Sequence, residues 1–172
     1  SRGRGDVYKR QVLYDLRNDV WSIHDIEHAT LRVAPDSTYK IYDALFGLEE
    51  GVITPEDSFI AWNGKNYPFE TWNSDQTLQS AMTSSVNWYF QAIDEQLAST
   101  NIRNYIQQIG YGNENVSGRL STYWLESSLK ISPVEQVKLL TKLQNNSLGF
   151  SSENINAVKD AICLSSSDAG TF

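Results

Sequence analysis

Pro35-Asp36-Ser37-Thr38-Tyr39-Lys40 stands directly before the apolar run Ile41-Tyr42-Asp43-Ala44-Leu45-Phe46-Gly47-Leu48. On a helix, Ser37 and Lys40 share one face with positions 41, 44, 45 and 48, which are all apolar. A lysine inside an apolar stripe is desolvated, so its neutral amine becomes accessible near neutral pH. A neutral amine one turn from a hydroxyl is a base beside a nucleophile. The stretch therefore predicts a buried helix that carries a serine–lysine acylation pair.

The Ser-x-x-Lys spacing is weak evidence by itself, because ordinary residue usage produces roughly one copy by chance in a chain of this length. A second copy does occur at Ser127 and Lys130, but it lacks a long apolar run and is cut short by Ser132-Pro133. We interpret that copy as accidental. The alternative for the first copy is structural: Ser37 caps a buried helix while the Lys40 amine reaches out to solvent.

Composition excludes several classes of function. The 172 residues are 40% hydrophobic and 12% aromatic, which is enough for one globular domain with a core. The net charge of -7, without a basic cluster among aromatic residues, argues against nucleic acid as a partner. No apolar stretch approaches membrane-spanning length. The single cysteine, Cys163, excludes an internal disulfide and a cysteine metal cluster, and His24 and His28 lack a third ligand, so no metal site is expected.

The two ends of the chain have an unusual character. Residues 1–11 are basic in an otherwise acidic chain, and residues 6–11 match the translation of a transposon end used in sequencing adaptors. We interpret residues 1–11 as a sequencing-adaptor scar and residues 12–172 as a partial domain. The chain stops after Phe172 without a capping element, so we expect further strands to follow it.

The remaining patterns predict mainly helices. Residues 12–16 and 20–23 alternate around a turn and predict a β-hairpin. Helical patterns cover residues 75–97, 99–109 and 152–164, and residues 52–74 resemble an aromatic loop. Ser132-Pro133-Val134-Glu135 is a capping box that opens another helix. A hairpin followed by helices and an abrupt stop predicts an α+β fold, truncated before its C-terminal strands.

A serine–lysine site also needs a second hydroxyl that relays the proton to the leaving nitrogen. Ser85 is the best candidate, because in a continuous helix it lies on the same stripe as Leu78, Met82 and Tyr89 and points inward. The structural alternative is a core serine that bonds to its own helix.

Four ordered blocks carry a resemblance to a known family. The chain resembles the penicillin-binding domain shared by class D β-lactamases and the β-lactam sensors of BlaR/MecR-type signal transducers, a β-lactamase/transpeptidase-like fold. The blocks are Ser37-Thr38-Tyr39-Lys40; Trp72-Asn73-Ser74-Asp75 with Ala81-Met82 and Ser85-Val86-Asn87-Trp88-Tyr89-Phe90-Gln91; Tyr111-Gly112-Asn113; and Tyr123-Trp124-Leu125-Glu126-Ser127-Ser128-Leu129-Lys130-Ile131-Ser132-Pro133.

The resemblance implies a role for each matching residue. Ser37 would be the nucleophile that opens the β-lactam ring, and Lys40 would be the base, in many family members as an Nζ-carbamate formed with carbon dioxide. Ser85 would shuttle the proton to the β-lactam nitrogen, and Trp124 would shield the modified lysine. The block at residues 111–113 would shape a loop.

Two departures from the family pattern matter. The Lys-Thr-Gly strand that holds the substrate carboxylate is absent, which truncation explains. The residue after Ser85-Val86 is Asn87, which resembles the sensors. The hydrolytic members of the family usually have valine at this position. An amide that hydrogen-bonds Lys40 would compete with the carbamate and slow deacylation. Slowing deacylation from about ten per second to about one per hour raises its activation barrier by about 6 kcal/mol, which is within the effect of losing a general base.

These observations favour a β-lactam antibiotic sensor domain over two alternatives. In the preferred interpretation, penicillin binds by covalent acylation of Ser37, deacylation is very slow, and resistance signalling follows. The first alternative is a class D β-lactamase, which would hydrolyse β-lactams by the same chemistry, and a weaker one is a penicillin-binding transpeptidase. The expected partners are β-lactam antibiotics, with no nucleic acid. A sensor would be extracytoplasmic and attached to a membrane only through segments outside this chain.

Overall fold

The computed structural model describes residues 11–15, 20–24 and 26–168. Its helices and strands are β1 (Gln11–Asp15), β2 (Val20–His24), α1 (Ile26–Thr30), η2 (Asp36–Tyr39), α2 (Lys40–Glu49), η3 (Glu70–Trp72), α3 (Leu78–Thr83), α4 (Asn87–Ile109), α5 (Pro133–Gln144) and α6 (Ser152–Asp168). The interpretation of residues 1–11 as a scar lies almost wholly outside the described residues. No helix in the described part of the chain is long and apolar enough to cross a membrane.

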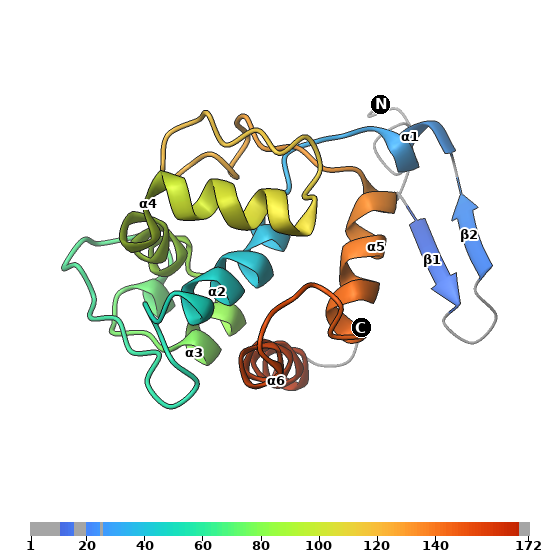
Figure 1. Ribbon diagram of the computed structural model, residues 1–172. Coiled ribbons are helices and arrows are strands. Elements are labelled where there is room, and N and C mark those ends of the chain that lie inside the picture. Colours follow the sequence, from blue (N-terminus) through green and yellow to red (C-terminus); the bar gives the residue numbers. More distant parts are fainter. Residues whose placement is uncertain (1–10, 16–19, 25, 169–172) are drawn as a thin grey trace, which may run out of the picture.

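Helix α2 lies at the centre of the molecule, between α4 and α6 (Figure 1). Helix α3 packs on α6, and α5 contacts both α1 and β1. The predicted hairpin is confirmed: β1 and β2 pair in antiparallel register, Val12 opposite Ile23. It lies at the edge of the molecule, beyond α5 (Figure 1).

The core forms around α2 because apolar residues occupy nearly all of its circumference. Tyr39, Leu45 and Phe46 are completely buried, and Ile93 of α4 and Trp124 of the following loop pack into the same core. The prediction that protein surrounds this helix is therefore confirmed. The helix ends at Glu49, shortly before Gly51, whose φ of +71° is a conformation that favours glycine.

One prediction about the helices is wrong. The sequence pattern suggested a continuous helical region over residues 75–97, but the structure divides it into α3 and α4 at Ser84, Ser85 and Val86. The expected break near residue 99 is present, because Ala98 has the non-helical angles φ 63° and ψ 159°. Buried apolar residues occur at helical spacing on both sides of the first break, Leu78 and Ala81 before it and Tyr89 and Ile93 after it, so the sequence pattern conceals the break.

The capping box predicted at Ser132 is confirmed. The Ser132 side chain accepts from the backbone N–H of Glu135, and the Glu135 side chain accepts in return from the Ser132 N–H, with Pro133 beginning α5. Glu135 also receives two 2.9 Å hydrogen bonds from Arg32. These bonds join α5 to the segment that leads into η2.

Candidate active site

Ser37 and Lys40 meet at the junction of η2 and α2. Ser37 lies in the 3-10 turn and is exposed, whereas Lys40 is the first residue of α2 and only 2% exposed. The Lys40 Nζ donates a hydrogen bond to the Ser37 Oγ over 3.1 Å. The one-turn spacing therefore produces the contact that the sequence predicted, and Lys40 does not reach out to solvent.

Ser85 belongs to the same cluster, but not for the reason the sequence suggested. It does not lie on a helical stripe. It follows α3 in a left-handed conformation with a φ of 51°. The Val86 N–H bonds back to the Ala81 carbonyl at 2.9 Å, and the Ser85 N–H to the Met82 carbonyl at 3.4 Å. This is a Schellman-type helix end with serine at the position that glycine usually occupies. Strain of this kind is typical of functional sites.

The left-handed turn aims the Ser85 hydroxyl at the serine–lysine pair. Its Oγ accepts a 2.8 Å hydrogen bond from the Lys40 Nζ and lies 3.3 Å from the Ser37 Oγ. One amine thus contacts two hydroxyls, and the three polar atoms form a triangle. This geometry allows a proton to pass from Ser37 to Lys40 and on to Ser85.

Aromatic rings surround the rest of the Lys40 amine. Nζ lies 5.4 Å from the ring centre of Trp124 and 5.8 Å from that of Phe90. Burial lowers the pKa of Lys40 to about 8, while the nearby Asp36 carboxylate opposes this shift. A lysine with this pKa is neutral in an appreciable fraction near neutral pH. The structure therefore provides the neutral amine that nucleophile activation requires.

Asn87 begins α4 two residues after Ser85. It lines a hollow of about 410 Å³ together with Ser37 and Ser85. The other lining residues are Phe69, Thr71, Trp72 and Ser84. Among the described residues, the Lys40 Nζ donates hydrogen bonds to the two serine hydroxyls, and none joins it to the Asn87 amide. Asn87 is therefore placed to influence a ligand beside Ser37, without binding Lys40 in this state.

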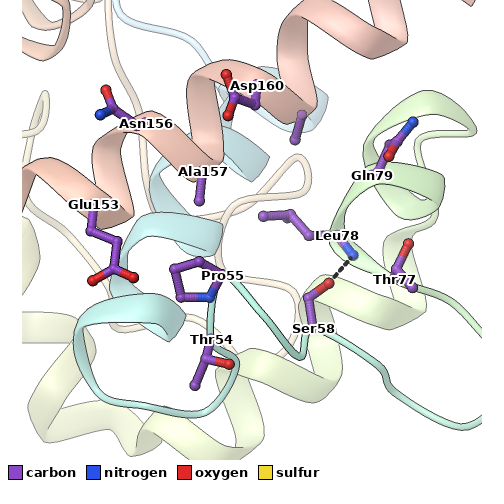
Figure 2. A pocket seen from close by; sticks show the side chains of 11 residues that line it. Thr54, Pro55, Ser58, Thr77, Leu78, Gln79, Glu153, Asn156, Ala157 and Asp160 are labelled. Atoms are coloured by element: carbon purple, nitrogen blue, oxygen red, sulfur yellow. Dashed lines mark hydrogen bonds between the residues drawn. The ribbon is translucent and has the colours of Figure 1, made fainter.

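A larger hollow of about 530 Å³ lies elsewhere, between the N-terminus of α3, the 54–58 segment and α6 (Figure 2). The Ser58 hydroxyl closes one side by accepting a 2.9 Å hydrogen bond from the Leu78 N–H (Figure 2). Glu153 and Asp160 of α6 lie on the opposite side (Figure 2). It contains none of the predicted site residues, so the smaller hollow is the candidate active site.

The block at residues 111–113 holds the loop that carries Trp124. Gly112 has a φ of +51°, and a Cβ there would lie 1.9 Å from the Lys130 carbonyl oxygen. The Asn113 side chain donates to the Ser128 carbonyl and accepts from the Lys130 N–H. These contacts support the interpretation of this block as a loop-shaping element. They also leave Lys130, the lysine of the second Ser-x-x-Lys copy, outside any helix and exposed.

Sequence reasoning missed a buried polar network behind Trp124. The Asp94 carboxylate accepts hydrogen bonds from the Trp124 Nε1 and the Tyr123 hydroxyl, both over 2.9 Å. Tyr39 bonds to Tyr123 through the two hydroxyls at 2.6 Å. The only sequence signals were the carboxylates of Asp43 and Asp94 inside apolar helices.

Comparison with known proteins gives the family. The sequence pattern of the penicillin binding protein transpeptidase domain matches residues 15–171. The chain is 45% identical to the regulatory protein BlaR1 of Bacillus licheniformis over 157 residues, which are 91% of this chain and 26% of that protein. It therefore spans about a quarter of the length of that relative.

Solved structures agree with the sequence comparison. The C-terminal domain of the Bacillus licheniformis BlaR penicillin-receptor matches with a TM-score of 0.85 and 45% identity, over 87% of this chain and 61% of that one. The class D β-lactamase BAT-2 matches with a TM-score of 0.85 and 37% identity, over 87% of this chain and 63% of that one. The predicted resemblance to sensor domains and class D β-lactamases, and the β-lactamase/transpeptidase-like fold, are confirmed.

Proposed function

Because this chain belongs to the penicillin binding protein transpeptidase domain family, we propose that it is the β-lactam-sensing part of a BlaR/MecR-type transducer. In that function a β-lactam acylates Ser37, and the acyl group stays long enough to act as a signal. The observation that carries the proposal is the triangle of Ser37 Oγ, Lys40 Nζ and Ser85 Oγ, with the amine almost completely buried.

The acylation step follows from the hydrogen bonds of this triangle. The neutral Lys40 amine accepts the proton of the Ser37 hydroxyl as the Ser37 oxygen attacks the β-lactam carbonyl carbon. The carbon–nitrogen bond of the ring then breaks. The Ser85 hydroxyl gives its proton to the departing nitrogen and is reprotonated by Lys40, so the amine ends neutral again.

Lys40 also fits the carboxylated lysine that the family resemblance implies. Carbon dioxide reacts with neutral amines, and burial keeps a neutral fraction of Lys40 available. The two serine hydroxyls and the Trp124 ring would surround the added group. When present, such a carboxylate would supply a general base for acylation and for the deacylating water.

The sequence relationship favours a sensor over a hydrolase, because identity with the BlaR1 protein is 45% and with the class D enzyme BAT-2 is 37%. Asn87 at the edge of the hollow supports the same choice. In this proposal the domain is extracytoplasmic, and membrane attachment comes from other parts of the transducer. The second candidate is a class D β-lactamase, which the same triangle supports.

Labelled penicillin tests the acylation proposal in the complete domain that contains this chain. We expect one label per molecule, attached to Ser37, and no label in the Ser37→Ala variant. Ser127→Ala is the matched control, since it changes the serine of the other Ser-x-x-Lys copy and should label normally. Labelling that survives Ser37→Ala would contradict the assignment.

A chromogenic cephalosporin separates the two candidate functions. A sensor should release about one equivalent of product per molecule and then stop. Continued release over many equivalents would identify a hydrolase.

A further inference from the structure

The Trp124 ring that covers Lys40 is held by a carboxylate from α4. The indole Nε1–H is the one polar group of this side chain, and it donates to the Asp94 Oδ2 over 2.9 Å. The other oxygen, Oδ1, accepts from the Tyr123 hydroxyl over 2.9 Å. Asp94 and Trp124 are both completely inaccessible to solvent. A single buried carboxylate therefore holds two consecutive residues of the loop.

The same network returns to the helix that carries Lys40. The hydroxyls of Tyr39 and Tyr123 lie 2.6 Å apart, and Tyr39 directly precedes Lys40. The Tyr39 and Trp124 rings also pack together, with centres 5.9 Å apart. Asp94 is thus connected both to the residue beside Lys40 and to the ring that covers its amine.

Asp43 completes the network as its second carboxyl group. It lies one turn after Lys40 on α2 and is completely buried, and neither of its oxygens accepts a hydrogen bond from the described residues. Burial, the charge of Asp94 and a hydrogen bond to Asp94 raise the pKa of Asp43 well above its usual range. Two adjacent buried carboxylates cannot both be ionised. Asp43 therefore keeps its proton and donates a hydrogen bond to the Asp94 carboxylate.

Of the two buried carboxyl groups, Asp94 and not Asp43 carries the negative charge. Burial raises the pKa of Asp94, and hydrogen bonds from Asp43, Trp124 and Tyr123 act in the opposite direction. Three donors around one carboxylate satisfy a buried charge, whereas Asp43 accepts no hydrogen bond from Trp124 or Tyr123.

We propose that Asp94 is a positioning residue for the acylation of Ser37: it fixes the Trp124 ring against Lys40 and so keeps water away from the amine, and neutral Asp43 holds Asp94 in place. This inference rests on the proposed function, because it assigns the support of the same site. Without the acceptor, a buried indole N–H loses its partner, and the ring moves to reach another one. Water then enters beside Lys40 and stabilises its charged form.

The pH dependence of acylation distinguishes positioning from general damage. We would measure the rate of Ser37 labelling by fluorescent penicillin from pH 6 to 10 in the complete domain. The midpoint is the pH at which the labelling rate reaches half its maximum. In Asp94→Leu this midpoint should rise by one pH unit or more, because solvation returns the pKa of Lys40 toward its usual value. A shift of two units lowers the neutral fraction at pH 7 by about 100-fold, with recovery at high pH. Asp36, the charged group that faces Lys40, stays unchanged throughout.

Two variants provide the comparison. Asp43→Asn is the conservative replacement, because a neutral amide still donates to Asp94 and should preserve the parent's midpoint. Glu95→Gln is the matched control: it removes an exposed carboxylate from the neighbouring position of α4 and should leave the profile unchanged. Nuclear magnetic resonance of the indole N–H groups gives a second readout, with the Trp124 signal assigned by its loss in Trp124→Phe. That signal should move in Asp94→Leu and stay in Asp43→Asn.

If Asp94→Leu does not fold, Asp94→Asn is measured with and without Trp124→Phe. Asparagine offers one acceptor oxygen where the carboxylate offers two, so it should raise the midpoint by a smaller amount. In the Trp124→Phe variant, which has no indole N–H, Asp94→Asn should cause no further rise of the midpoint. Folded Asp94 variants that keep the parent's midpoint overturn the inference while the proposed function stands. A parent protein that never labels at Ser37 removes the proposed function itself.

Discussion

Lys40 shows how burial turns an ordinary side chain into a candidate base. Its position in an apolar stripe predicts desolvation, and in the structure it is 2% exposed with a pKa lowered to about 8. The sequence suggested this environment because a helix places residues three and four apart on one face. The rings that enclose the amine come from Phe90 and Trp124, far along the chain.

The first prediction at this scale concerns the pH dependence of acylation. Lys40 accepts a proton only when neutral, so the rate should rise about tenfold per pH unit below 8 and level off above it. Lys40→Met should lower the rate by about 10²- to 10⁴-fold, because it removes the base. Stopped-flow labelling with fluorescent penicillin measures both, and Lys130→Met is the control. An unchanged rate in Lys40→Met would remove this residue from the mechanism.

The second prediction concerns Asn87. Asn87→Val should speed deacylation by at least about tenfold, or about 1.4 kcal/mol, because an apolar side chain in the hollow favours a carboxylated Lys40 that activates water. The half-life of labelled protein after removal of free penicillin measures the effect. Thr83→Val, a similar change at an exposed position of α3, is the control. An unaltered half-life would refute this account of Asn87.

Among the elements, the connection from α4 to the Trp124 loop depends on one close backbone approach. Gly112 allows it, because its φ is positive and the Lys130 carbonyl occupies the space of a Cβ. The loop in turn places Trp124 against α2, and the Trp124 carbonyl accepts from the Asp36 N–H over 3.1 Å. The backbone conformation of Gly112 therefore determines how the Trp124 ring covers the active site.

A glycine substitution tests this dependence. Gly112→Ala should lower the free energy of unfolding by about 2–4 kcal/mol, since it adds both backbone strain and a clash with backbone. Gly64→Ala is the matched control: its φ is also positive, at +79°, but nothing lies within 4 Å of the added Cβ. We expect about 1 kcal/mol there. Equal losses in urea unfolding of the two variants would contradict the role of the close approach.

At the scale of the whole molecule, the site is assembled from segments far apart in sequence. An isolated antiparallel bridge pairs Val33, shortly before η2, with Ile131, shortly before α5. The Asp36 side chain accepts a hydrogen bond from the Glu126 N–H. The hairpin β1–β2 lies apart from this assembly, beyond α5 (Figure 1). A two-stranded sheet by itself is marginally stable in water.

Extending the chain tests the contribution of the rest of the domain. The matched part, 87% of this chain, covers 61% of the solved BlaR domain. A version extended to that full length should unfold at a higher temperature and label at least about tenfold faster, because further strands would cover the hairpin and bind the substrate carboxylate. Thermal unfolding followed by circular dichroism and the labelling rate measure the two effects. Equal values for the two lengths would contradict the expected C-terminal strands.

The amino-acid sequence by itself determined the features whose geometry is complete within one or two turns. The contact of Ser37 with Lys40 follows from helical spacing, and the capping box at Ser132 follows from the order of four residues. The tertiary structure decided the placement of Ser85, because a left-handed helix end leaves the apolar pattern unbroken. It also decided the bond between Asp94 and Trp124, 30 residues apart. Such a meeting depends on how the helices bury their apolar faces together and on the need to pair every polar group they enclose.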